Sequence, residues 1–120
     1  MKLFLLSFSM LNLLDVVTNI GCSGTASEFD DGESYSVKCT FSCGGSVYGC
    51  PKNNGWVSSD SSICLAAKML AIRSGSPFTL VRAGQQDSYE SCTMNGYTSN
   101  SYGSWAGSYR IETSKASCFK

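Results

Sequence analysis

The feature that most constrains the fold of this chain is the presence of seven cysteines among only 120 residues. Cysteines at this density in a small protein predict a disulfide framework, which forms in oxidising compartments. A zinc site is the weaker interpretation, because Cys39 and Cys43 form a C-x-x-x-C spacing without a second tight pair, and the chain contains no histidine. The odd number leaves at least one cysteine for an intermolecular bond, for a free thiol or for removal with a leader.

The N-terminal segment is predicted to be a secretory signal peptide. Lys2 precedes a mainly apolar run over residues 3–17, and this order is typical of a leader. The run is too short for a membrane span, which needs roughly 20 predominantly apolar residues, and it contains Asp15. We assign residues 1–21 to the signal peptide and 22–120 to the mature domain, so the protein is expected to be secreted or held in a vesicle lumen. The candidate cleavage sites follow Thr18, Gly24 and Ala26.

The charge balance and the absence of histidine exclude several classes of function. Lys and Arg total nine, as do Asp and Glu, so the net charge is zero and no basic block marks a nucleic-acid surface. Without histidine, neither a Ser-His-Asp nor a Cys-His nucleophile can form within the chain. No motif indicates a Ser-Lys dyad, a carboxylate pair or an EF-hand, so we predict a non-enzymatic protein without cofactor or metal.

The clearest predicted element is a helix over about residues 62–73. Asp60 and Ser61 are favourable N-cap types directly before it, and Gly75 lies beyond its end, where a left-handed residue is wanted. Lys68 is the only polar residue in its apolar stretch. Because a surface helix has a single apolar stripe, this pattern predicts a helix that is enclosed on most sides.

Short strands are predicted on both sides of this helix in the sequence, because apolar and polar residues alternate there. The turn signal Asn95-Gly96 separates two of them. The predicted fold is a single α+β domain, in which one central helix is wrapped by short antiparallel β-strands and disulfides stabilise the whole. The predicted strands cover residues 35–39, 47–50, 78–82, 89–92, 96–99 and 109–112.

Several motifs occur in a characteristic order from residue 22 to residue 112. They are CTFSC, SVYG, DSSIC with the alanine-bearing helix, Tyr89, the Asn95-Gly96 pair and a final aromatic strand. This order resembles the LCCL domain, the extracellular module of factor C and cochlin-type proteins. The resemblance implies a helix wrapped by β-sheet and a role in extracellular recognition, for which lipopolysaccharide and other surface ligands have been proposed.

The resemblance also implies two disulfides. The family pattern places one bond between Cys22 and Cys39 and another between Cys43 and Cys64. We add a third bond between Cys50 and Cys92. This assignment leaves Cys118 unpaired or available to link two chains. The predicted disulfide residues are Cys22, Cys39, Cys43, Cys64, Cys50 and Cys92.

Four aromatic residues in polar, glycine-rich surroundings are predicted ligand contacts: Tyr89, Tyr97, Tyr102 and Trp105. Rings beside Ser, Asn and Gly provide rigid apolar area together with adaptable hydrogen bonds, whereas any single ring is more often part of a core. The expected partner is an extracellular glycan, a lipid or lipopolysaccharide, or a protein.

A basic contact to an anionic lipid would need a cluster assembled from residues that are scattered in sequence. The candidates are Lys52, Arg73, Arg82 and Arg110. The alternative function is a structural component of an extracellular or secretory-vesicle matrix, in which Cys118 forms a disulfide-linked dimer.

Overall fold

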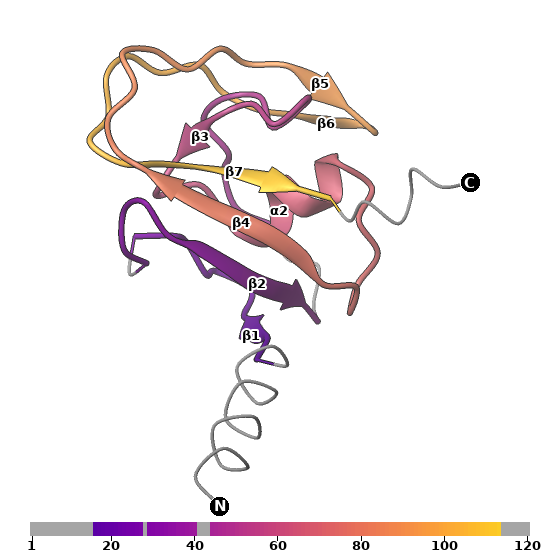
Figure 1. Cartoon of the computed structure of the whole chain (residues 1–120). Coiled ribbons are helices and arrows are strands. Elements are labelled where there is room, and N and C mark those ends of the chain that lie inside the picture. The colour runs from indigo at the N-terminus through magenta and orange to yellow at the C-terminus, as the bar shows by residue number, and fades with distance from the viewer. Residues whose placement is uncertain (1–15, 28, 41–43, 114–120) are drawn as a thin grey trace, which may run out of the picture.

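The computed structural model describes residues 16–27, 29–40 and 44–113, where one short helix accompanies seven β-strands (Figure 1). Five strands form a sheet in the order β1-β2-β4-β7-β3, and β5 pairs with β6 in a separate hairpin. All neighbours are antiparallel except β1 and β2. The predicted α+β class is therefore confirmed. The elements are β1 (Thr18–Ile20), β2 (Ser34–Cys39), β3 (Val57–Ser58), α2 (Ile63–Met69), β4 (Phe78–Ala83), β5 (Thr93–Met94), β6 (Tyr97–Thr98) and β7 (Ser108–Glu112).

Strand β4 forms the middle of the sheet, and its alternating sequence explains its position. Phe78 and Leu80 are buried on the face toward α2, while the alternating residues Thr79 and Val81 are only half-buried. Leu80 is in register with Tyr35 of β2 on one side and with Ile111 of β7 on the other. The predicted strands over 35–39, 78–82 and 109–112 are thus confirmed as the three inner strands.

Other predicted strands differ from the structure. Residues 47–50 and 89–92 form no strand, and they contribute only isolated bridges, which join Tyr48 to Asn100, Gly49 to Val57, and Tyr89 to Tyr102. Conversely, β3 lies in a segment for which no strand was predicted, and β1 lies in the range assigned to the leader. Two- or three-residue strands carry too little alternation to be recognised without their partners.

The Asn95-Gly96 pair forms the predicted tight turn between β5 and β6. Both residues have positive φ, 49° for Asn95 and 83° for Gly96, as a two-residue hairpin loop requires. The side-chain nitrogen of Asn95 donates to the carbonyl oxygen of Met69 at 2.7 Å. The hairpin is therefore attached to the C-terminal end of α2.

Helix α2 is shorter than the sequence predicted. It begins after Ser62, whose hydroxyl accepts a hydrogen bond from the Leu65 amide at 3.2 Å. It ends at Met69 because Ala71 adopts a left-handed conformation with φ of 60°, which the sequence analysis had expected of Gly75. An alanine in this conformation gives no sequence signal, since glycine is the usual residue there.

The sheet covers one side of α2, and loops cover much of the rest (Figure 1). The Ile63 amide donates to the carbonyl of Gly24, and the Ser62 amide donates to the carbonyl of Ser46. Five of the seven helix residues are buried, as the enclosed-helix prediction required. The prediction that strands wrap the helix was more detailed than the structure supports. The sheet covers one side of α2, and loops rather than strands approach the sides away from the sheet.

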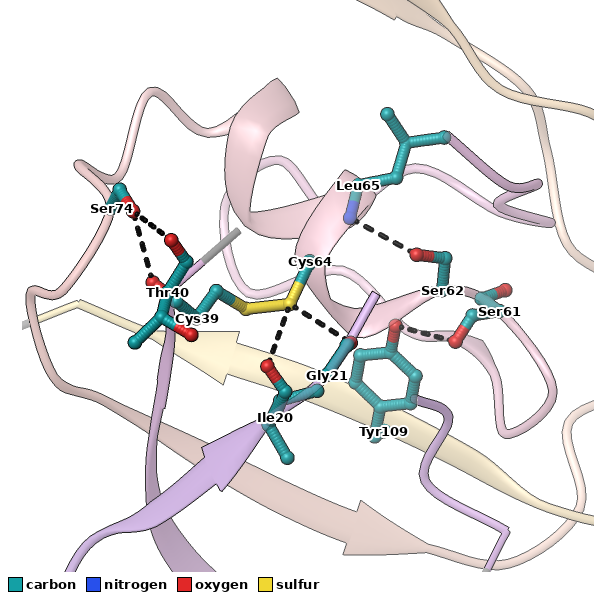
Figure 2. The surroundings of a disulfide bond; sticks show 10 residues. All are labelled: Ile20, Gly21, Cys39, Thr40, Ser61, Ser62, Cys64, Leu65, Ser74 and Tyr109. Atoms are coloured by element: carbon teal, nitrogen blue, oxygen red, sulfur yellow. Dashed lines mark hydrogen bonds between the residues drawn. A yellow bond between two sulfur atoms is a disulfide. The ribbon is translucent and has the colours of Figure 1, made fainter. Parts of the chain in front are cut away.

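The disulfides correct the pairing that the family resemblance implied. Cys39 is bonded to Cys64, with Cα atoms 5.7 Å apart, so the bonds Cys22–Cys39 and Cys43–Cys64 are wrong (Figure 2). The reason is the pleat of β2, which directs Val37 and Cys39 to the buried face, where α2 presents Cys64.

The remaining cysteines complete this correction. The bond between Cys50 and Cys92 is present as predicted, with Cα atoms 5.4 Å apart. Cys22 is disulfide-bonded and exposed. Cys43 and Cys118 lie outside the described residues.

The Cys39–Cys64 bond lies where β1, β2 and α2 meet (Figure 2). The Cys64 sulfur is 3.8 Å from the Ile20 carbonyl oxygen and 3.7 Å from that of Gly21. The Ser74 hydroxyl donates to the carbonyl of Thr40 at 2.9 Å, which holds the end of β2 close to the segment after α2. This corner connects three elements that are distant in sequence.

Candidate ligand-binding site

Three aromatic rings from two loops meet at the surface. Tyr48 precedes β3, whereas Tyr102 and Trp105 lie in the segment between β6 and β7. The ring centroids of Tyr48 and Tyr102 are 5.6 Å apart, as are those of Tyr102 and Trp105, and both pairs are edge-to-face. The segment is held by backbone hydrogen bonds in both directions between Tyr89 and Tyr102 and between Gln86 and Trp105. Rings on loops fixed in this way are positioned before any ligand arrives.

These rings line a hollow of about 240 Å³ together with Ser58 and Asp60. We call it the aromatic hollow, and its residues are Tyr48, Ser58, Asp60, Tyr102 and Trp105. Tyr102 is 46% exposed, and Tyr48 and Trp105 are half-buried. The hollow therefore combines accessible ring surface with polar groups, which is the usual composition of a small-ligand site.

A hydroxyl network fixes the polar side of the aromatic hollow. The Ser58 hydroxyl donates to Oδ1 of Asp60 at 2.5 Å and lies 2.9 Å from the hydroxyl of Ser61. The Ser61 hydroxyl in turn accepts a hydrogen bond from the Tyr48 amide at 2.9 Å. Ser58 and Ser61 are buried, whereas Asp60 is exposed. The carboxylate is thus oriented from inside the protein and accessible from outside.

A second hollow of about 250 Å³ adjoins the first, because Tyr48 and Asp60 line both. Its other walls are hydroxyls and glycine backbone, and among the described residues neither hollow is lined by a lysine or an arginine. Of the described lining residues of both hollows, only Asp60 carries a formal charge. The remaining residues of the second hollow are Ser23, Thr25, Gly44, Gly45, Ser46 and Ser62.

The structure brings only two of the four predicted aromatic contacts together, Tyr102 and Trp105. Tyr89 is 3% exposed, and its hydroxyl donates to the Gly107 carbonyl at 3.2 Å. Burial raises the pKa of this phenol above its ordinary value, against the effect of a backbone hydrogen bond at Gln86, which lowers it. Tyr89 therefore supports the loop that carries Trp105 instead of presenting its own ring.

Tyr97 is the other predicted contact that lies apart from the aromatic hollow. Its ring lies beneath the Lys68 ammonium of α2, with Nζ 5.0 Å from the ring centroid. Its strand, β6, belongs to the hairpin that packs at the end of the helix. The four aromatics thus occupy three environments, which sequence proximity alone could not distinguish.

Two of the four basic residues considered for an anionic ligand, Arg82 and Arg110, are held in contacts within the protein. Arg82 is 8% exposed, its Nε donates to the Ala26 carbonyl at 2.8 Å, and its Nη1 lies 2.8 Å from Oδ1 of Asp31. Arg110 pairs with Glu112 and lies 5.4 Å from the ring centroid of Trp56. Both side chains are committed to structural contacts.

The sequence analysis missed Tyr48 and Asp60 as site residues. Tyr48 was placed within a strand, and Asp60 was interpreted only as an N-cap type. The actual cap is Ser62, which leaves the Asp60 carboxylate available for the aromatic hollow. The signal that could have identified Tyr48 is the pair of glycine-bearing turns on either side of SVY, because such turns mark exposed loops.

In the part of the chain that the structure describes, no group of three or more His, Cys, Asp or Glu side chains could hold a metal ion. The same residues include no helix long and apolar enough to cross a membrane.

A disulfide-bonded α+β domain with an open, preformed hollow belongs to the class of small recognition modules. A family model, the LCCL domain, matches residues 18–109. The chain therefore belongs to the LCCL domain family, as its motif order had suggested. Domains of this family are generally non-enzymatic binding modules of extracellular proteins. No curated protein sequence matches the chain.

Proposed function

We propose that this protein binds an extracellular ligand through the aromatic hollow. The observation that supports this most directly is the convergence of Tyr48, Tyr102 and Trp105 on one open hollow that also exposes a carboxylate. Aromatic rings contribute large contact area at small entropic cost, and adjacent polar groups orient the ligand. The ligand classes that fit such a site are a glycan, a lipid headgroup or a protein side chain.

Long-range attraction to an anionic surface is not the expected driving force. The net charge of the whole chain is zero, and Arg82 and Arg110 already have carboxylate partners. A basic contact to lipopolysaccharide would depend on charges that the aromatic hollow lacks. Binding that relies on rings should change little with salt, because screening weakens contacts between exposed charges and leaves ring packing nearly untouched.

The proposal is tested by screening the oxidised protein on glycan and lipid arrays and then measuring two variants. Tyr102→Ala and Trp105→Ala are expected to weaken binding of the array-identified ligand by about tenfold or more, as loss of a central aromatic contact does. Tyr97→Ser is the matched control, because the Tyr97 ring lies beneath the Lys68 ammonium and outside the hollow. Binding by both hollow variants as tight as wild type would contradict the proposal.

The alternative function, assembly into an extracellular or vesicular matrix, predicts a different result. The arrays would then show no specific ligand, and a non-reducing gel would show disulfide-linked oligomers that a Cys118→Ser variant abolishes. A monomeric band on that gel, together with array binding, favours recognition.

We also propose that the protein is exported and that its leader ends at or before Thr18. Strand β1 pairs with β2 and buries Ile20, and the family match begins at residue 18. Cleavage after Gly24 or Ala26 would remove this strand and the disulfide-bonded Cys22. N-terminal sequencing of the secreted protein tests the boundary, and a first residue beyond Asn19 would contradict it.

A further inference from the structure

We infer that the aromatic hollow recognises an ammonium group, either a protonated amine or a quaternary ammonium, carried by a compact organic ligand. This inference rests on the proposed function, because it assigns a ligand class to the same site. It starts from the combination of one exposed carboxylate with three aromatic rings in a hollow of about 240 Å³. Both kinds of group attract cations, the carboxylate by its charge and the rings by the negative potential of their faces.

No ion pair neutralises the carboxylate of Asp60 within the part of the chain that the structure describes. Among the residues that the structure describes, the ion pairs join Arg82 to Asp31 and Arg110 to Glu112. From the described residues, the Asp60 carboxylate accepts a hydrogen bond only from the neutral hydroxyl of Ser58, at Oδ1. Its charge is therefore oriented toward the hollow and available to a cation from solution.

Arg82 is the basic residue whose positive charge would oppose the attraction of a cation to Asp60. Its charge and that of Asp60 both influence the phenol of Tyr89, with opposite signs. However, Arg82 is 8% exposed, is paired with Asp31 at 2.8 Å, and donates from Nη1 to the Ala83 carbonyl at 2.6 Å. Its charge is balanced and held in the interior, so it does not supply an anion site in the hollow.

The ring arrangement favours a compact cation over a flat sugar ring. The interplanar angle is 67° between Tyr48 and Tyr102 and 77° between Tyr102 and Trp105. No two neighbouring rings share a plane, so they form no extended platform for stacking. Walls that face different directions suit a roughly spherical group, and cations are attracted within about 6 Å of a ring centroid.

The polar edge of Trp105 is also unavailable to sugar hydroxyls. Its indole N–H donates to the Ser59 hydroxyl at 3.2 Å inside the protein. The ring therefore offers its carbon surface to the hollow. The neighbouring hollow, which is lined by uncharged hydroxyls, would accept a neutral polar part of the same ligand but would not compensate a phosphate.

The decisive experiment compares choline with 3,3-dimethylbutan-1-ol, which has the same shape without the charge. Both are titrated into the oxidised full-length protein, and binding is followed by calorimetry and by the NMR shift of the Trp105 indole N–H. Choline is expected to bind at least about fivefold more tightly, since one opposite charge at contact distance contributes that much even when well screened. Equal binding of the two probes, or none of either, overturns the inference.

Two variants and two controls test whether choline binds in the aromatic hollow. Asp60→Asn keeps an oxygen for the Ser58 hydroxyl and should weaken choline binding by about fivefold or more. Trp105→Ala should weaken it by about two- to thirtyfold, the range of desolvated cation–ring contacts. Asp87→Asn, an exposed carboxylate outside both linings, and Tyr97→Ser should leave choline binding unchanged. Equal effects of Asp60→Asn and Asp87→Asn would overturn the inference.

The inference and the proposed function fail in distinguishable ways. If an array-identified ligand depends on Tyr102 and Trp105 but choline binds no better than its neutral isostere, the site stands and the ammonium specificity is wrong. If that ligand binds the hollow variants as tightly as wild type, the site itself is wrong. Where choline binds, sedimentation with phosphatidylcholine vesicles identifies the source: co-sedimentation that free choline suppresses indicates a lipid headgroup, and its absence indicates a free ligand.

Discussion

Tyrosine side chains are buried in the interior of the protein but partly exposed in the aromatic hollow. Tyr109 is completely buried between the sheet and α2, and its hydroxyl donates to the Ser61 carbonyl at 3.1 Å. Tyr102 leaves 46% of its surface exposed and is contacted mainly at its ring, by Tyr48 and Trp105. A ring whose polar end is satisfied inside the protein stabilises the fold, whereas a ring with open surface remains available to a partner. Burial, and not residue type, therefore separates structural from functional aromatics here.

The largest effect on the interior is expected from removal of the Cys39–Cys64 disulfide. Replacing both residues by alanine should lower the free energy of unfolding by about 2–5 kcal/mol, because the bond ties β2 to α2 across a sequence separation of 25 residues. Urea denaturation measures the change. An unchanged midpoint would show that the sheet and helix hold together without this bond.

The pairing of this disulfide can be tested directly by chemical analysis. Peptide mapping under non-reducing conditions should recover a peptide that links Cys39 to Cys64 and another that links Cys50 to Cys92. A peptide that links Cys22 to Cys39 would contradict the structure and restore the pairing implied by the family pattern.

A smaller effect is expected from overpacking the helix. Ala67 is 3% exposed, so Ala67→Leu should cost about 1–3 kcal/mol of stability. Lys68→Ala is the matched control on the same helix, because Lys68 is half-buried and loses only its contact with the Tyr97 ring, about 1 kcal/mol or less. Equal denaturation midpoints for Ala67→Leu and wild type would refute the tightly enclosed helix.

The buried phenol of Tyr109 predicts a loss of stability at alkaline pH. Burial, and to a smaller extent the charge of Asp60, raises the pKa of this phenol well above its ordinary value. Below about pH 10 the group is neutral in both states, so its contribution to stability is fully present. At higher pH the unfolded chain releases the proton while the folded protein retains it, and stability falls by about 1.4 kcal/mol per pH unit.

Denaturation midpoints measured from pH 8 to about pH 11 test this prediction. Tyr109→Phe should show a shallower decline, although it is less stable at neutral pH because the Ser61 carbonyl loses its partner. Parallel declines in wild type and variant would assign the alkaline sensitivity to other groups.

The smallest effect on stability is expected in the aromatic hollow. Tyr102→Ala should change the free energy of unfolding by about 0.5 kcal/mol or less, because the side chain is 46% exposed and no described residue forms a hydrogen bond with its phenol. The same variant should lose ligand binding. A large destabilisation by Tyr102→Ala would remove the contrast between the two regions and make this ring part of the fold.

Sequence patterns predicted the three inner strands, but they also predicted strands over residues 47–50 and 89–92, which form only isolated bridges. The inner strands β2, β4 and β7 and the Asn95-Gly96 turn follow directly from such patterns. The end of α2 did not, because Ala71 adopts a conformation that its residue type disfavours. Only the tertiary surroundings of that turn, including the hydrogen bond from Asn95 to Met69, select it.

The site was less predictable than the fold for a physical reason. Aromatic residues that are close together in sequence lie in three different places: the interior, the hairpin and the hollow. Their positions depend on the paths of the loops, which no local sequence pattern predicts. The pairing of Cys39 likewise depends on which residue the opposite element presents to a buried strand face. Tyr48 and Asp60 meet Trp105 only after the chain between them has folded.

The position of β7 also determines when this domain can complete its fold during biosynthesis. β7 is the last strand of the described chain, yet it lies between β4 and β3, and β3 pairs with no other strand of the described residues. As the polypeptide leaves the ribosome, Val57 of β3 emerges long before residues 108–112 are available to pair with it. A nascent chain halted before residue 108 would lack the strand that joins the two parts of the sheet. The domain therefore completes its sheet only after residues 108–112 have been synthesised, and a truncation before residue 108 removes the strand that joins β3 to β4.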